Sequence, residues 1–211
     1  MPLSTYSDSE WIPDAVDTSS QEKNGYLEII LGPMKSGKTS RLIQLYRQNE
    51  FCDIPTVVIN QMSDKRYHDI LLSTHDEIMI PCIQAERLTD LWSLPDSSTR
   101  SASVILINEG QFFPDLVPVV TDMVAHGKKV HVCGLDGDYK RDKFGGLLDL
   151  IPLCDSVTKL SSLCGLCKNG TAGIFTLRLT DETEQTVIGT SNYIPVCRGC
   201  YHTQTRIRPV R

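Results

Sequence analysis

The sequence predicts an α/β protein in which a parallel sheet is flanked by helices and followed by a small C-terminal metal-binding domain. Three observations support this prediction. Short apolar segments alternate with helix-patterned segments over the first 150 residues, as in proteins built from βαβ units. The first of these segments runs directly into a glycine-containing loop. After about residue 150, two closely spaced pairs of cysteines appear.

The strands and helices follow from local sequence patterns. Runs rich in β-branched residues predict strands at 26–31, 55–60, 77–83, 104–107 and 128–135. Apolar residues at helical spacing, such as Leu42, Leu45 and Tyr46, predict helices at 38–51, 84–92 and 114–126. Residues 93–103 are expected to form a loop, and residues 175–189 alternate like a hairpin.

The predicted sheet also gives the position of a ligand site. Ligands of open parallel sheets bind beyond the carboxyl ends of the strands. The loops that follow the predicted strands are therefore expected to lie at one edge of the sheet, and they begin after Leu31, Asn60, Ile107 and Leu135.

Composition argues against several classes of protein. The net charge of -5 and the lack of a long basic run do not favour a nucleic-acid partner. No apolar window of ~18 residues predicts a membrane span. The N-terminus lacks the basic and apolar regions of a secretory signal. We therefore expect a cytoplasmic protein with reduced thiols, whose eight cysteines are metal ligands or buried small side chains.

The loop after the first strand fits the phosphate-binding pattern G-x-x-x-x-G-K-[ST]. Its glycines permit backbone conformations in which amides point at phosphate oxygens, at the positive end of the next helix. The lysine adds a charge near the β- and γ-phosphates, and the threonine hydroxyl can bind Mg²⁺. The predicted ATP-binding loop consists of Gly32, Pro33, Met34, Lys35, Ser36, Gly37, Lys38 and Thr39.

Two C-x-x-C units predict a structural zinc site. Each unit places two thiolates on one tight turn, and two units supply the four sulfurs of a closed tetrahedral site. A pair of separate redox dithiols is the alternative, but neither unit follows a strand and opens a helix as in thioredoxins. The predicted ligands are Cys164, Cys167, Cys197 and Cys200, and small core residues are expected at Cys52, Cys82, Cys133 and Cys154.

A phosphate loop combined with a four-cysteine module is uncommon, and other stretches add to it: "DKRY", "STHD", "EGQFFPD", "LDGDYKRDKFGGLLDLIPL", "SVTKL", "YIPVC" and "CRGCY". With them the sequence resembles the thymidine kinases of the zinc-containing, cellular (type II) class. These are P-loop deoxynucleoside kinases, which also occur in large DNA viruses and bacteria. The resemblance covers about residues 26 to 203.

The resemblance implies transfer of the γ-phosphate of ATP to the 5′-hydroxyl of thymidine or deoxyuridine. Glu109 would be the general base, because a carboxylate can orient the attacking oxygen and take its proton. Asp76 would join Thr39 at the magnesium ion. Asn108 and Gln111 would also lie at the ATP site. Arg66 would be a candidate phosphate contact.

The resemblance also implies a two-sided pocket for the base. Apolar and stacking walls would come from Phe112, Leu135, Tyr139 and Phe144. A lasso-type loop between the cysteine pairs would close over the pyrimidine, and the zinc would reduce the ordering entropy of that closure. Its backbone groups would meet the base at Gln185, Thr186, Val187, Ile188 and Gly189, and Tyr193 would brace the sugar side.

Asn108 is the clearest departure from the family pattern, which has aspartate before the glutamate. An amide keeps an acceptor oxygen but loses a negative charge, and Mg²⁺ prefers charged oxygens. We therefore expect an active kinase with altered magnesium dependence. The alternatives are a catalytically impaired thymidine-binding relative, a regulatory NTP switch, and a zinc-ribbon nucleic-acid binder.

These observations predict four segments. They are a disordered lead at 1–24, a nucleotide-binding domain at 25–150, a zinc-binding and lasso-loop domain at 151–205, and a short basic tail at 206–211. By resemblance alone, we expect a homotetramer, feedback inhibition by thymidine triphosphate (dTTP), and a place in the cytoplasm, or in that of the host if the protein is viral.

Overall fold

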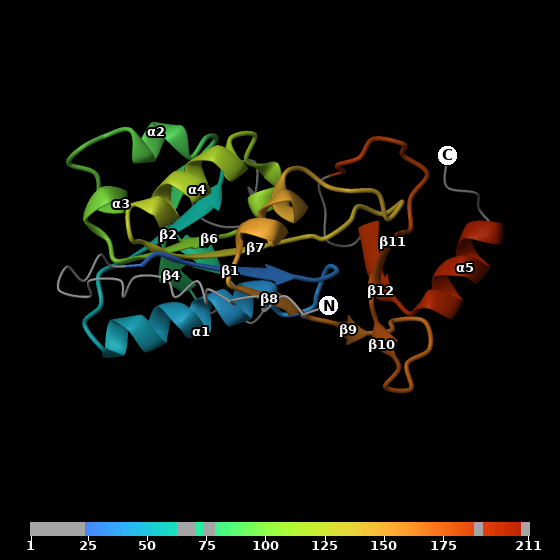
Figure 1. Cartoon of the computed structure of the whole chain (residues 1–211). Coiled ribbons are helices and arrows are strands. Elements are labelled where there is room, and N and C mark those ends of the chain that lie inside the picture. Colours follow the sequence, from blue (N-terminus) through green and yellow to red (C-terminus); the bar gives the residue numbers. More distant parts are fainter. Residues whose placement is uncertain (1–23, 63–70, 74–78, 188–191, 208–211) are drawn as a thin grey trace, which may run out of the picture.

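The computed structural model describes residues 24–62, 71–73, 79–187 and 192–207. At its centre lies a six-stranded sheet in the order β5-β2-β6-β7-β1-β8. All neighbouring strands in this sheet are parallel. The prediction of an α/β protein with a parallel sheet is therefore confirmed. Figure 1 shows α1 on one face of the sheet, α2, α3 and α4 on the other, and a separate C-terminal part at one end.

The four inner strands of the central sheet, β1, β2, β6 and β7, are short and almost wholly buried, as their β-branched composition predicts, whereas the edge strands β5 and β8 are only partly buried. The bounds are β1 Tyr26–Leu31, β2 Thr56–Gln61, β5 Ile83–Ala85, β6 Val104–Ile107, β7 Lys129–Gly134 and β8 Ser156–Lys159. β8 begins after residue 150, so the central sheet includes a strand from beyond the alternating part of the sequence.

Helices cover both faces of the sheet and divide its core in two. α1 (Lys38–Phe51) buries Leu42 and Ile43 against Ile30, Val58 and Leu106. The opposite face packs against α4 (Leu116–Ala125) and the 3₁₀-helical segment η2 (Leu147–Leu153). The short helices α2 (Thr89–Trp92) and α3 (Ser98–Ser101) complete this layer. No helix in the described ranges is long and apolar enough to span a membrane.

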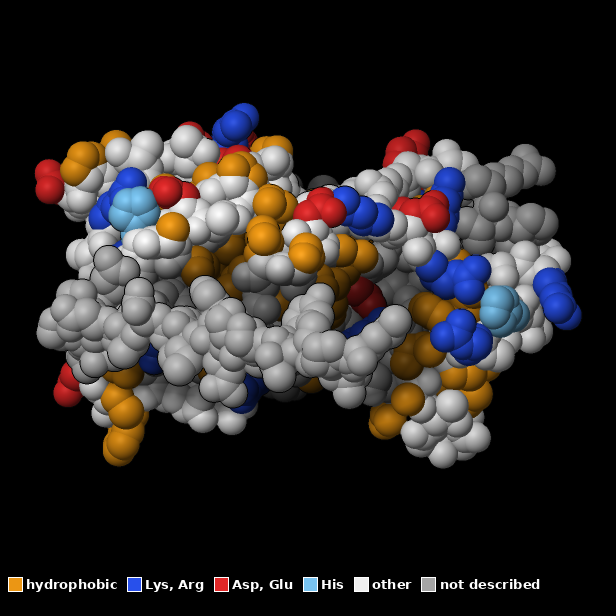
Figure 2. Space-filling model, in the orientation of Figure 1, with side chains coloured by type: hydrophobic (Ala, Val, Ile, Leu, Met, Phe, Trp, Pro, Cys, Tyr) orange, Lys and Arg blue, Asp and Glu red, His pale blue; other side chains and the backbone are white. Residues whose placement is uncertain are grey.

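The C-terminal part has its own small core of Cys164, Leu177, Val196 and Tyr201. It holds two antiparallel strand pairs, β9 with β10 and β11 with β12, and the terminal helix. On the face seen in Figure 2, Lys and Arg side chains gather over this part. Its elements are β9 Ser162–Leu163, β10 Ala172–Gly173, β11 Phe175–Arg178, β12 Tyr193–Val196 and α5 Arg198–Ile207.

Several predicted elements differ from the structure. The strand expected at 77–83 is replaced by β4 (Met79–Pro81), which pairs with β3 (Leu71–Ser73), and by β5 in the central sheet. Residues 84–92 form a helix only at α2, because β5 takes the start of this stretch.

Further local predictions also differ from the structure. A hairpin is present, but its second strand is β12 (Tyr193–Val196), which pairs antiparallel with β11, and not a strand within residues 175–189. The loop expected at 93–103 contains α3, which the Ser97 side chain caps by accepting from the Arg100 amide. Cys52 is exposed rather than a core residue, whereas Cys133 is buried as predicted.

Candidate functional site

The phosphate loop joins β1 to α1 at the carboxyl edge of the sheet. Gly37 precedes the helix with φ 85°, a left-handed conformation that favours glycine. A Cβ atom at Gly32 would lie only 2.8 Å from the Leu160 carbonyl oxygen, so this position has no room for a side chain. The loop therefore presents the first amides of α1 at the sheet edge, the arrangement that binds phosphate.

Two polar side chains of this loop fit a phosphate ligand. Lys38 is buried and its Nζ donates to the carbonyl oxygens of Gly32 and Pro33, at 3.1 and 2.8 Å, so the amine lies on the loop itself. The Ser36 hydroxyl is buried and has no hydrogen-bond partner in the described part of the chain. Buried polar groups usually have partners, and a bound phosphate oxygen would supply one.

Glu109 follows β6 in a left-handed conformation with φ 53°. Its Oε2 accepts a hydrogen bond from Gln111 Nε2 at 2.6 Å, and Gln111 Oε1 accepts from the Leu135 amide at 3.0 Å. These contacts tie the carboxylate to the loop after β7. Glu109 is half-buried, so the carboxylate is accessible to a ligand at this edge. A carboxylate so held can accept a proton from a hydroxyl group.

Asn108 is buried, and both ends of its amide have protein partners. Its Nδ2 donates to Asn60 Oδ1 at 2.8 Å, and its Oδ1 accepts from the Cys133 thiol at 3.1 Å. Asn60 Nδ2 in turn donates to Gln84 Oε1 at 3.2 Å. Burial raises the pKa of Cys133 to about 12, and the negative charge of Glu109 adds to this effect, so the thiol keeps its proton. Asn108 is thus one member of a polar row that crosses four strands.

The four residues predicted for the walls of the base pocket make two kinds of contact. Phe112 and Phe144 contact each other edge to face, with ring centroids 5.1 Å apart. Tyr139 is buried and its hydroxyl donates to the Thr183 carbonyl oxygen at 2.9 Å. Leu135 is half-buried beside Gln111. Tyr139 therefore contacts the loop between β11 and β12, residues 179–192, which we call the substrate loop.

The C-terminal part contacts the phosphate loop directly. The Met34 amide donates to Thr176 Oγ1 on β11 at 3.0 Å. Thr176 is buried, and Arg178 follows two residues later on the same strand. Since alternate residues of a strand share a face, β11 places a phosphate-loop contact and Arg178 on one side. The two halves of the predicted site therefore lie next to each other.

Sequence reasoning missed two residues that hold the substrate loop. Arg178 donates to Tyr193 Oη at 2.6 Å and to carbonyl oxygens of the loop. Asp138 Oδ2 accepts from Gln185 Nε2 at 2.9 Å, while its Oδ1 accepts from the amides of Lys140 and Asp142. Arg178 was not predicted, because a single arginine at the end of β11 does not reveal which groups it contacts. Some predicted residues lie outside the described ranges: Arg66, Asp76, Ile188 and Gly189.

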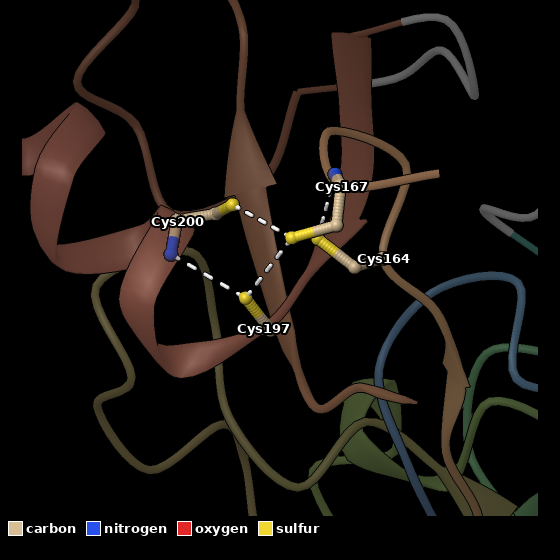
Figure 3. Close-up of side chains that lie close together, drawn as sticks. All are labelled: Cys164, Cys167, Cys197 and Cys200. Carbon is tan, nitrogen blue, oxygen red and sulfur yellow. Dashed lines mark hydrogen bonds between the residues drawn. The ribbon is translucent and has the colours of Figure 1, made fainter. Parts of the chain in front are cut away.

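The four predicted zinc ligands converge in the C-terminal part, as Figure 3 shows. Their sulfur atoms all lie within 4.8 Å of one another, and Cys167 Sγ is 3.7 Å from Cys197 Sγ and 3.4 Å from Cys200 Sγ. A tetrahedral zinc ion with Zn–S bonds of about 2.3 Å places its sulfurs roughly 3.8 Å apart. The observed cluster could therefore hold such an ion.

The electrostatics of Cys164 also suit a metal ligand. Burial raises the pKa of the thiol, but hydrogen bonds from the backbone N–H groups of Cys167, Cys197 and Leu166 outweigh this and lower it to about 6. The thiolate is the form that binds metal. The first pair lies in the turn after β9, and the second follows β12 and opens α5. The expectation that neither unit lies between a strand and a helix was therefore wrong for the second pair. One ion would join the two segments that flank residues 168–196.

The parallel sheet, the phosphate loop, the carboxylate beside it and the four-cysteine cluster define a P-loop nucleotide-binding protein whose cysteines could hold a metal ion. The thymidine kinase family model matches residues 25–201. This chain belongs to the thymidine kinase family.

Individual relatives agree with this assignment. The chain is 39% identical over 180 residues to the thymidine kinase of Yaba monkey tumor virus, covering 85% of this chain and 96% of that protein. It is 38% identical over 199 residues to the cytosolic thymidine kinase of Bos taurus, covering 94% and 81%. It is 39% identical over 178 residues to the thymidine kinase of vaccinia virus (strain Ankara), covering 84% and 97%.

Proposed function

We propose that this chain transfers the γ-phosphate of ATP to the 5′-hydroxyl of thymidine, and of deoxyuridine, and so supplies thymidine monophosphate for DNA synthesis. The observation that carries the proposal is the hydrogen bond between the Met34 amide and Thr176 Oγ1. It brings the phosphate loop against the strand that leads into the substrate loop. A triphosphate on the first and a nucleoside under the second would lie close enough for direct transfer.

Each residue has a defined task in this proposal. The phosphate-loop amides and Lys38 would hold the triphosphate, which orients the γ-phosphorus. Glu109 would accept the proton of the 5′-hydroxyl as its oxygen attacks that phosphorus and the bond to the β-phosphate oxygen breaks, which leaves ADP. Thr39 and Asp76 would hold Mg²⁺, which neutralises phosphate charge when bound.

The pocket for the nucleoside would combine both parts of the molecule. Phe112, Leu135, Tyr139 and Phe144 would supply its apolar walls. The backbone of residues 185–189 would pair with the pyrimidine edge, with Tyr193 on the sugar side. Zinc on the four cysteines would have a structural role, since four thiolates leave no open coordination position for chemistry.

The proposal for Asn108 is an active enzyme with altered magnesium dependence. Its amide already has two protein partners, Asn60 and Cys133, which fix the orientation of the side chain. We therefore attribute its effect to charge: an amide contributes one negative charge less near the metal than aspartate would. A catalytically impaired relative is the second candidate, and Asn108 is the residue that favours it.

The decisive test is transfer of radiolabelled phosphate from ATP to a panel of deoxynucleosides. We expect thymidine to be the best acceptor, deoxyuridine to follow, and purine deoxynucleosides to remain unlabelled. Preference for GTP without transfer to any acceptor would instead support a regulatory nucleotide switch. Tight thymidine binding without transfer would support the impaired relative.

Three further properties belong to the same proposal. As the end product of the pathway, dTTP would inhibit by spanning the phosphate loop and the base pocket, so its inhibition should compete with both substrates. We propose a homotetramer, which size-exclusion chromatography with light scattering would test. We also propose a cytoplasmic location, or that of the host if the protein is viral, which fluorescence microscopy of a tagged protein would test.

A further inference from the structure

The substrate loop lacks an apolar anchor in its described residues. Side chains from Asp181 to Thr186 are all exposed. The apolar cluster of the C-terminal part takes residues from the flanking strands, such as Leu177 and Val196, and none from 179–187. Burial of apolar surface, the usual source of order in a folded chain, is therefore missing here. Polar contacts must hold the backbone of this loop in place.

Arg178 supplies most of these contacts from a single buried side chain. One terminal nitrogen donates to the carbonyl oxygens of Glu182 and Glu184, at 2.9 and 2.5 Å. The other donates to the carbonyl oxygen of Gln185 and to Tyr193 Oη, at 3.0 and 2.6 Å. Each terminal nitrogen of a guanidinium carries two hydrogens, so all four have a partner. Hydrogen bonds from a charged donor are stronger than neutral ones.

Two tyrosines complete the arrangement around this guanidinium. Arg178 lies over the ring of Tyr139, 3.6 Å from its centroid, and the Tyr139 hydroxyl donates to the carbonyl oxygen of Thr183. Tyr193 Oη accepts from Arg178 and also from the Val187 amide at 3.1 Å. The carbonyl oxygens of four successive residues, 182 to 185, therefore all accept from the body of the protein.

We propose that Arg178 is a positioning residue for the nucleoside: it does not touch the substrate, but it fixes the backbone that does. The inference rests on the proposed function, because it requires the described residues Gln185, Thr186 and Val187 to contact the pyrimidine through their backbone. The physical reason is that a backbone segment that recognises a base binds it well only if its N–H and C=O groups already point toward the base before binding. Otherwise binding the base would have to supply the cost of ordering the loop.

Arg178→Lys tests this proposal and preserves the charge. An ammonium group is a compact point charge with three donors and cannot reproduce a planar four-bond fork. We expect the KM for thymidine to rise at least about tenfold, while the KM for ATP changes less than about twofold. The matched control is Arg198→Lys. Arg198 is also in the C-terminal part, lies 5.0 Å from the ring centroid of Phe175, and is exposed.

A second readout needs no activity. A glutamate-specific protease should cut after Glu182 and Glu184 faster in Arg178→Lys than in the wild type or the control, as followed by mass spectrometry. Unchanged cutting together with an unchanged KM for thymidine would overturn the proposal. Equal rises in both KM values with loss of bound zinc would also overturn it, since that pattern reports a folding defect. If the wild type phosphorylates no nucleoside, the proposed function fails, and faster cutting of the variant still supports the role of Arg178 in ordering the loop.

Discussion

The phosphate loop and the substrate loop are held by opposite means. The phosphate loop is continuous with β1 and α1, whose residues Ile30 and Leu42 are fully buried in the central core. The substrate loop has exposed side chains and depends on one arginine, two tyrosines and the cysteine cluster. The first is thus formed with the core itself, whereas the second can be disturbed while the core stays folded. This difference suits a site that must admit and release a nucleoside.

Removal of the metal should show the difference between the two loops most clearly, because it should affect the substrate loop and leave the phosphate loop intact. We expect Cys200→Ser, or a strong chelator on the wild type, to abolish thymidine phosphorylation. The reason is that a structural zinc site contributes roughly 10–16 kcal/mol of apparent binding energy to local folding. Binding of a fluorescent ATP analogue to the phosphate loop should persist, because the central core does not include the cluster. Cys52→Ser, at an exposed cysteine, is the control. Equal loss of nucleotide binding would mean that the two loops do not fold independently.

Glu109→Gln should give the next largest effect, on chemistry alone. We expect kcat to fall about 100- to 10,000-fold, the range that a general base contributes. The amide can still contact Gln111, so the KM values for ATP and thymidine should stay near those of the wild type. Steady-state kinetics and a thermal unfolding curve of both proteins would check this. Turnover near the wild-type rate would remove Glu109 from the mechanism.

The contrast between the two loops also explains which parts of the fold and site could be predicted from the sequence. The strand, loop and helix at 26–51 were predicted because each carries its own local signal: β-branched residues, fixed glycines and helical spacing. The cysteine pairs were predicted to meet because one shared ion accounts for both of them. Arg178 was missed because its partners are backbone carbonyl groups, which leave no mark in a sequence. The row of Gln84, Asn60, Asn108 and Cys133 was missed because it depends on strand order.

Asn108→Asp tests how the polar row affects the metal, and its effect should be smaller. We expect the Mg²⁺ concentration for half-maximal activity to fall several-fold, because a carboxylate adds charge near the ion. A carboxylate cannot donate to Asn60 as the amide does, so the Asn60 side chain must turn to donate instead. Activity measured against Mg²⁺ concentration for both proteins would decide this. Superimposable curves would show that position 108 does not influence the metal, and activity in the variant alone would show that asparagine disables the enzyme.

The smallest predicted effect concerns a buried pair on the central sheet, away from both loops. His131 Nδ1 donates to Glu28 Oε2 at 2.9 Å, and Glu28 Oε1 accepts from Thr158 at 2.8 Å. Burial lowers the pKa of His131, and the charges of Arg41 and Lys129 act in the same direction, against the opposing effect of Glu28. The neutral imidazole is therefore the form in the folded protein at neutral pH.

This pair makes the sheet sensitive to acid in a defined direction. Below pH 6.5, the ordinary pKa of histidine, the unfolded chain takes up a proton at His131 before the folded chain does. The stability that this group contributes is thus present above pH 6.5 and is lost as the pH falls through the lowered folded pKa. Urea unfolding at pH 7.5 and 5.5 should show a smaller decrease for His131→Leu than for the wild type. The variant should also be about 1–3 kcal/mol less stable at pH 7.5, because the buried Glu28 loses a donor. An equal decrease in both proteins would mean that another group, and not His131, sets the acid sensitivity of the sheet.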